Sequence, residues 1–199
     1  MFAVLDLAQD HSGVLHAGKL CGHDATEVLQ DPDKLFASLM KVHQLYTPSG
    51  QPVVFDLQLE AEALGCELVW AKDCPPSVKS HPLADDPTVP CLCTLPTEQS
   101  GRIPLVLDVM RRMKTAVGET TALYGLVCGP FTLASHLRGN DIFMDMFDDP
   151  AYVTALLDYA TRVARRMSDL YIDAGMDVIA YVDPLVSQIS PRTFASYLE

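Results

Sequence analysis

The sequence predicts an α/β fold of the TIM (β/α)8-barrel class, and specifically about its first half, with four parallel strands and their helices. Apolar runs of strand length alternate with amphipathic helices, most clearly over residues 171–194. Such alternation forms parallel sheets through right-handed crossovers. A complete barrel takes about 250 residues, whereas this chain has 199 and its last helix meets no stop signal. We therefore expect residues 1–199 to form one domain, the truncated N-terminal half of a barrel.

Turn and capping signals divide the chain into these elements. Asp31 and Asp149 each precede a proline, a pattern typical of a helix N-cap, and the second helix closes at Gly175. Residues 8–30 are rich in glycine and polar residues and are predicted as loop, and residues 75–96 as an irregular excursion. The four predicted strands of the sheet are 1–7, 52–58, 121–127 and 177–182, and a short further strand is predicted over 67–70. The predicted helices are 32–46, 60–65, 104–117, 150–174 and two that open at Pro130 and Pro191.

Composition excludes several classes of function. The formal net charge of −12 argues against nucleic-acid binding and against docking on anionic membranes, both of which use clustered Lys and Arg. The apolar runs are too short for a transmembrane helix, and the N-terminus lacks the basic segment of a signal peptide. Six cysteines in a long, apolar chain do not indicate a disulfide scaffold. We expect a soluble cytoplasmic protein.

Two carboxylates follow predicted strands. Asp56 lies near the end of the second strand among apolar residues, and Asp183 lies where the fourth strand stops. In a parallel barrel both would reach the same face, where active sites form. A buried ion pair or strand-end cap is the alternative for Asp56, and a cap of the following turn is the alternative for Asp183.

The third strand leads through Gly129 into a helix that contains His136. Free backbone N–H groups at such a helix start can hold an anion, although the stretch matches no nucleotide-binding motif. His136 is a candidate catalytic residue, with a structural polar role as the alternative. Gln9 and His11 follow the first strand and are candidate substrate contacts, with ordinary loop polarity as the alternative.

Histidines and cysteines also gather in two looser groups. Neither group has the paired spacing of a zinc site, so neither is predicted to bind a metal. The groups are His16, Cys21 and His23, and His81, Cys91 and Cys93.

Three blocks of this chain resemble the uroporphyrinogen decarboxylase superfamily, which contains porphyrinogen decarboxylases and methylcobamide:coenzyme M-type methyltransferases. The blocks are residues 55–68, 125–139 and 174–194, in the family's order. The resemblance runs over residues 52–199 and implies a (β/α)8 barrel.

The resemblance is closer to the methyltransferase branch. Asp56 matches the Asp with which the decarboxylases hold pyrrole N–H groups. However, their Arg-rich N-terminal segment is not found here, and His136 and Pro184 stand where they have Tyr and Ser. The run that contains Glu60 and the pattern around Asp183 look more like the methyltransferases. That branch implies a zinc-activated thiol that takes a methyl group from a corrinoid.

The resemblance also implies where the site residues lie. The family's zinc ligands, a His-x-Cys pair and a later Cys, belong to the second half of the barrel, so no metal ligand is assigned here. Asp56, His136 and Asp183 are the candidate catalytic residues of the first half. The candidate substrate contacts are Gln9, His11, Glu60 and Gly129.

Two alternatives to the methyltransferase hypothesis remain open. The first is decarboxylation of a porphyrinogen, which needs cationic groups for several carboxylates. The second is a non-catalytic fragment that binds a corrinoid protein or a partner half-barrel. Under any of the three, we expect residues 1–199 alone to be inactive. A His-x-Cys motif and a later Cys encoded beyond Glu199 would select the methyltransferase.

A half-barrel leaves open strand edges and an apolar inner face, which associate unless they are covered. We therefore predict that the isolated chain self-associates. Light scattering at micromolar concentration should report a mass above that of one chain, and a strict monomer would contradict the prediction.

Overall fold

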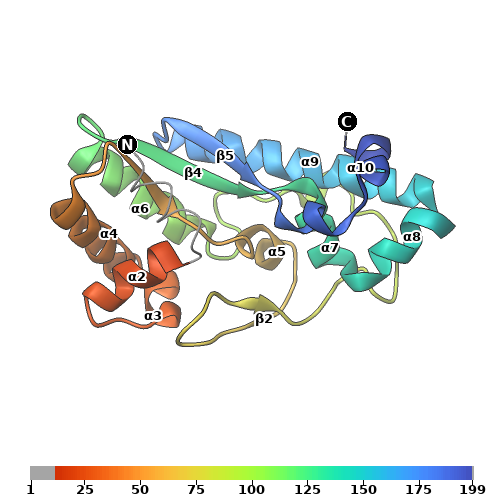
Figure 1. Cartoon of the computed structure of the whole chain (residues 1–199), viewed down its shortest axis with the longest axis horizontal. Helices are drawn as coiled ribbons and strands as arrows, with labels where there is room; N and C mark the ends of the chain where they lie inside the picture. The colour runs from red at the N-terminus through yellow and green to blue at the C-terminus, as the bar shows by residue number, and fades with distance from the viewer. Residues whose placement is uncertain (1–11, 199) are drawn as a thin grey trace.

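The computed structural model of this chain describes residues 12–198, and a three-stranded parallel sheet runs through it (Figure 1). The strands are β1 (Gly50–Val54), β4 (Ala122–Cys128) and β5 (Val178–Val182), in the order β1-β4-β5. Gly50 pairs with Ala122 and Tyr124 pairs with Val178. The parallel α/β prediction is confirmed. The predicted strand 1–7 lies outside the described residues and stays a prediction.

Helices connect and cover these strands. The longest, α9, begins at its Asp149 cap and runs from Pro150 to Asp173, as predicted. The α-helices are α2 (Ser12–Leu20), α3 (Ala25–Gln30), α4 (Pro32–Tyr46), α5 (Leu59–Ala63), α6 (Ile103–Val117), α7 (Pro130–Arg138), α8 (Ile142–Asp148), α9 and α10 (Pro191–Tyr197), with 3-10 turns η1 (Leu92–Thr94), η2 (Gly139–Asp141) and η3 (Pro184–Gln188).

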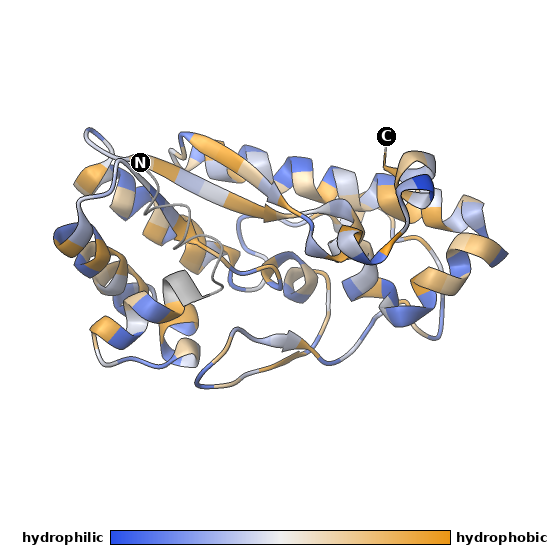
Figure 2. Ribbon diagram, in the orientation of Figure 1, coloured by the Kyte–Doolittle hydropathy of each residue, from blue (hydrophilic) through white to orange (hydrophobic). Residues whose placement is uncertain are grey.

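Helices α6 and α9 lie along one face of the sheet (Figure 1), and much of β4 and β5 is hydrophobic (Figure 2). An apolar stripe of α9 at helical spacing is buried in the hydrophobic core; its residues are Val153, Leu157, Ala160, Ala164, Met167 and Tyr171. Gly125 allows the close approach of β4 to α9, because a Cβ there would lie 2.6 Å from Cδ2 of Tyr171. This packing fixes the position of β4 relative to α9.

The predicted loop over residues 8–30 is wrong where the structure describes it, since α2 and α3 occupy most of residues 12–30. Asp24 and Glu27 form a capping box at the start of α3: Glu27 N donates to Asp24 Oδ1 at 2.9 Å, and Asp24 N donates to Glu27 Oε2 at 3.0 Å. This four-residue pattern is visible in the sequence, but the glycines at 13, 18 and 22 favoured the loop prediction.

The second predicted strand, 52–58, extends four residues too far at its C-terminal end. β1 ends at Val54, and the chain turns so that Gln58 N donates to Asp56 Oδ1 at 3.0 Å. Between α5 and α6, β2 (Leu68–Val69) pairs antiparallel with β3 (Ser77–Val78), separate from the main sheet. Over residues 12–198, no helix is both long and apolar enough to cross a membrane.

Candidate functional site

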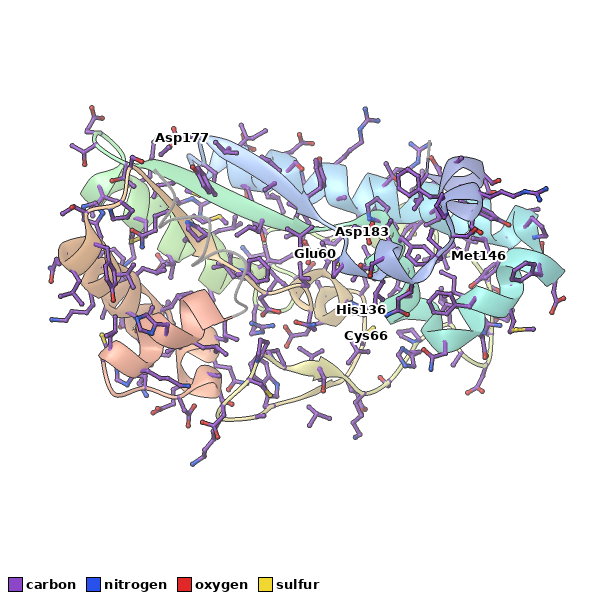
Figure 3. All side chains as sticks on the ribbon, in the orientation of Figure 1. Glu60, Cys66, His136, Met146, Asp177 and Asp183 are labelled. Atoms are coloured by element: carbon purple, nitrogen blue, oxygen red, sulfur yellow. The ribbon has the colours of Figure 1, made fainter. Side chains whose placement is uncertain are left out.

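Polar side chains converge where β1, β4 and β5 end. Figure 3 shows Glu60, His136 and Asp183 in this region and Asp177 at the opposite end of β5. Asp56 lies two residues beyond β1, and Asp183 directly follows β5. Because the strands are parallel, their carboxyl ends share one edge of the sheet. The predicted juxtaposition of strand-end residues therefore occurs.

Asp56 is held in a buried ion pair, the alternative that the sequence had left open. Its side chain is fully buried, and its Oδ2 lies 2.7 Å from Nη2 of Arg102. Arg102 Nε donates to Glu62 Oε2 at 2.6 Å, and Trp70 lies with its ring centroid 4.7 Å from the guanidinium carbon. The guanidinium thus links the end of β1 to α5 and to the start of α6. A ligand-facing role of Asp56 stays a prediction.

Glu60 projects from α5 into the same region and is 1% exposed. Its Oε1 accepts from the backbone N–H of Cys128, the last residue of β4, at 3.0 Å. Its Oε2 has no hydrogen-bond partner among residues 12–198. Burial, and secondarily the nearby Asp56 carboxylate, raises the pKa of Glu60 to about 7, against the bond from Cys128. Glu60 can therefore exchange a proton near neutral pH.

His136 lies on α7 and is mostly buried, with no hydrogen-bond partner for Nδ1 among the described residues. Burial, with a smaller contribution from His81, lowers the pKa of His136 to about 4. The ring is therefore neutral at pH 7. The backbone oxygen of His136 accepts from His81 Nδ1 at 2.8 Å and from Cys66 Sγ at 3.4 Å. These two contacts fix the backbone of α7 at His136 and do not involve the imidazole ring.

Asp183 caps the helix that follows β4. Its Oδ2 accepts from Phe131 N at 2.9 Å, and its Oδ1 accepts from the Thr132 backbone at 2.8 Å and the Thr132 hydroxyl at 2.6 Å. The anion expected at this helix start is thus the chain's own carboxylate. Gly129 makes room for it, since a Cβ there would lie 2.2 Å from Cβ of Asp183. Both residues therefore position α7 and β5.

An open hollow of about 610 Å³ lies beside this cap, between α9, β5 and α10. Its described walls include Gly129 and Asp183 together with Tyr181, Phe194 and Tyr197. Glu60 and His136 are not among those walls. Of the three candidate catalytic residues, only Asp183 borders this hollow.

Two predicted substrate contacts cannot be placed relative to the cluster. Gln9 and His11 lie outside the described residues, so their roles stay predictions. His16 Nε2 lies 3.4 Å from the hydroxyl of Tyr46, within the N-terminal helices. Within the range 12–198, no group of three or more His, Cys, Asp or Glu side chains could hold a metal ion.

Sequence reasoning missed two residues of this site. Arg102 stands at the N-cap of α6, 46 positions after Asp56, and nothing local links it to that carboxylate. Tyr171 is fully buried, and burial, followed by the charges of Glu60 and Asp56, raises its pKa well above the usual value. Tyr171 was identified only as part of the apolar stripe of α9. Its proximity to two acids depends on the packing of α9 against β4.

Parallel strands alternating with helices, with polar groups gathered at the strand carboxyl ends, are the arrangement of parallel α/β proteins, including the α/β barrels. The sequence pattern of the uroporphyrinogen decarboxylase family, described as "Uroporphyrinogen decarboxylase (URO-D)", matches residues 14–198. The chain belongs to this family, and the predicted resemblance is confirmed.

Curated relatives include both branches of the family. Methylcobamide:CoM methyltransferase MtaA of Methanosarcina barkeri is 33% identical over 170 residues, covering 77% of this chain and 47% of the relative. Methylcobamide:CoM methyltransferase MtbA of Methanosarcina acetivorans is 28% identical over 163 residues, covering 81% and 48%. A uroporphyrinogen decarboxylase of Prochlorococcus marinus is 23% identical over 175 residues, covering 84% and 49%.

A solved structure agrees with the fold. A methyltransferase from Methanosarcina mazei superposes with a TM-score of 0.84 at 26% identity, covering 93% of this chain and 56% of that protein. The predicted barrel fold class is thereby confirmed. The chain spans about half the length of these relatives.

Glu60 should make stability depend on pH. Its pKa rises from 4.5 to about 7 on folding, so its contribution is complete below pH 4.5 and is lost as the pH rises through 7. A shift of this size corresponds to roughly 3 kcal/mol in the free energy of unfolding. Denaturant unfolding of the wild type and of Glu60→Gln between pH 4.5 and 8 should show a difference that changes by an amount of this order.

Taking the difference in unfolding free energy between the wild type and Glu60→Gln cancels the contributions of other titrating groups. His136, whose pKa is lowered, acts in the opposite direction over part of this range, but it does so in both proteins. The amide oxygen of Gln still accepts from Cys128 N. A stability difference that is constant with pH would contradict the proposed burial of Glu60.

Proposed function

We propose that the whole protein transfers a methyl group from a corrinoid to a small thiol, and that this chain forms part of the substrate pocket. The observation that carries the proposal is that both arginines near the site are already paired with acidic side chains of this chain. Arg102 is bound by Asp56 and Glu62. Arg138 is bound by Asp145 at 2.6 Å, and its Nη1 donates to two backbone oxygens. Neither guanidinium is available for the carboxylates of a porphyrinogen.

The relatives support the same choice. The named methylcobamide:CoM methyltransferases are 28–33% identical to this chain, whereas the uroporphyrinogen decarboxylase is 23% identical. Their names supply the corrinoid and the thiol for the proposal. Decarboxylation of a porphyrinogen and a purely binding role are the outcomes against which the proposal is tested.

Each residue of the cluster has a distinct proposed role. Glu60 contacts the substrate through its unpartnered Oε2 and takes up the proton that the thiol releases, since its pKa lies near 7. His136 offers a neutral ring nitrogen as a second polar contact. Asp56 and Asp183 are positioning residues, because each carboxylate is already bound by protein groups. Gly129 contributes by admitting Asp183 to the helix start.

Residues 12–198 present no cluster suited to a metal, so the described residues do not fit a zinc site. We propose that any zinc ligands lie beyond this chain. A corrinoid, carried by a partner protein, is proposed as the methyl donor.

We also propose that the chain associates through the outer edge of β5. No strand among residues 12–198 pairs with this edge, and Val178 and Tyr181 are 43% and 55% exposed. An uncovered parallel edge beside apolar side chains favours pairing with another strand. The partner is a second copy when the chain is isolated.

Methyl transfer tests the proposal directly. The protein made from its complete gene, supplied with methylcobalamin and coenzyme M, should demethylate the corrinoid, which is followed by absorbance. Glu60→Gln should lower kcat/KM by about 10-fold, because it removes a proton acceptor in the pocket. Residues 1–199 alone should show no transfer.

A matched control is Glu67→Gln, since Glu67 is exposed and pairs with Lys79 away from the strand ends. That variant should retain wild-type activity. Release of carbon dioxide from a porphyrinogen without methyl transfer would replace the proposal with decarboxylation. Corrinoid binding without turnover by the complete protein would replace it with a binding role.

A further inference from the structure

Two cysteines that do not belong to the strand-end cluster share one short, exposed turn. Cys91 and Cys93 flank Leu92 in the segment between β3 and α6, and both are exposed. Cys66 and Cys128 differ from them, because burial raises their thiol pKa values, that of Cys66 to about 12. Accessible thiols are the ones that react with solutes. The turn therefore places two reactive groups side by side.

The turn directs a backbone hydrogen bond at one sulfur. The backbone N–H of Cys93 donates to Cys91 Sγ at 3.2 Å. The neighbouring Cys93 side chain lowers the pKa of Cys91, with the backbone N–H as a second cause, whereas the Cys91 side chain raises the pKa of Cys93. Cys91 is thus favoured over Cys93 as the nucleophile.

The protein body holds the turn in place. Thr94 Oγ1 donates to the Cys91 backbone oxygen at 2.7 Å and lies 2.9 Å from the hydroxyl of Tyr159. Because the Thr94 proton is already used, Tyr159 donates in that contact. Tyr159 lies on α9 and is 2% exposed. The cysteine pair is therefore attached to the longest helix of the core.

The spacing permits a disulfide between the two residues. Cα atoms two positions apart lie within about 7 Å in any conformation and closer in a 3-10 turn. Disulfides span about 4.4–6.8 Å between Cα atoms. Within residues 12–198, no group of three or more ligands for a metal includes this pair. The pair therefore fits two-thiol chemistry better than metal binding.

We propose that Cys91 and Cys93 form a thiol–disulfide exchange site for small-molecule disulfides. The Cys91 thiolate attacks one sulfur of the disulfide, forms a mixed disulfide and releases the other half as a thiolate. Cys93 then loses its proton to solvent and attacks Cys91 Sγ, which releases the second half. The protein dithiol is oxidised by two electrons, and the small disulfide is reduced to two thiols. This chemistry is independent of the proposed methyl transfer.

Mass spectrometry of the chain tests this site with bis(2-hydroxyethyl) disulfide as the probe. Trypsin releases residues 80–102, which contain Cys91 and Cys93 and no other cysteine, while Cys74 falls in residues 73–79. After acid quenching and alkylation, peptide 80–102 should have lost two hydrogen atoms. It should react at least about 10-fold faster than exposed Cys74, the internal control.

Two variants separate the roles of the sulfurs. Cys93→Ser should accumulate the hydroxyethyl adduct on Cys91 without an internal disulfide. Cys91→Ser should leave Cys93 no faster than Cys74. Adducts on both Cys91 and Cys93 in the wild type, with no internal disulfide, would overturn the proposal. Equal rates for Cys91 and Cys74 would overturn it as well.

Discussion

The burial of acids at the end of β1 depends on the guanidinium of Arg102. It lies 2.7 Å from Asp56 and 2.6 Å from Glu62, and its Nη1 donates to Leu29 O. These contacts bring the end of β1, the helix α5 and the start of α6 to one point. Without a cation there, two neighbouring carboxylates would lose their hydration with no counter-charge, which is strongly unfavourable. Asp56 also raises the pKa of the neighbouring Glu60 and Arg102 lowers it, each by less than burial raises it.

A second constraint joins β5 to α7. The Asp183 carboxylate occupies the start of α7, and Gly129 leaves it the space to do so. This contact connects segments more than 50 residues apart and fixes the position of the end of β5 relative to the end of β4. Asp56 and Asp183 therefore shape the site, whereas Glu60 and His136 retain unpartnered atoms inside it. This cluster at the strand ends is built by charged residues, and within it the pKa of Glu60 is raised to about 7 and that of His136 is lowered to about 4.

Local signals predicted much of this fold, and contacts distant in sequence could not be predicted. Asp31 and Asp149 were identified as caps because a cap and the proline after it are adjacent in the sequence. The parallel order of the strands followed from their alternation with helices. The partner of Asp56 was not predictable, since Arg102 reaches it only after α6 packs beside β1. The helix α8 was missed for a related reason: it is seven residues long and is secured by Arg138 binding Asp145.

The coupling between Asp56 and Arg102 tests the central claim most directly. We would measure the free energy of unfolding of the wild type, Asp56→Asn, Arg102→Met and the double variant. Arg102→Met alone should cost about 3–5 kcal/mol, because it leaves buried carboxylates unpaired. The double variant should recover part of that cost, giving a coupling energy of at least about 1 kcal/mol. Additive costs within about 0.5 kcal/mol would contradict the claim that this ion pair holds the site together.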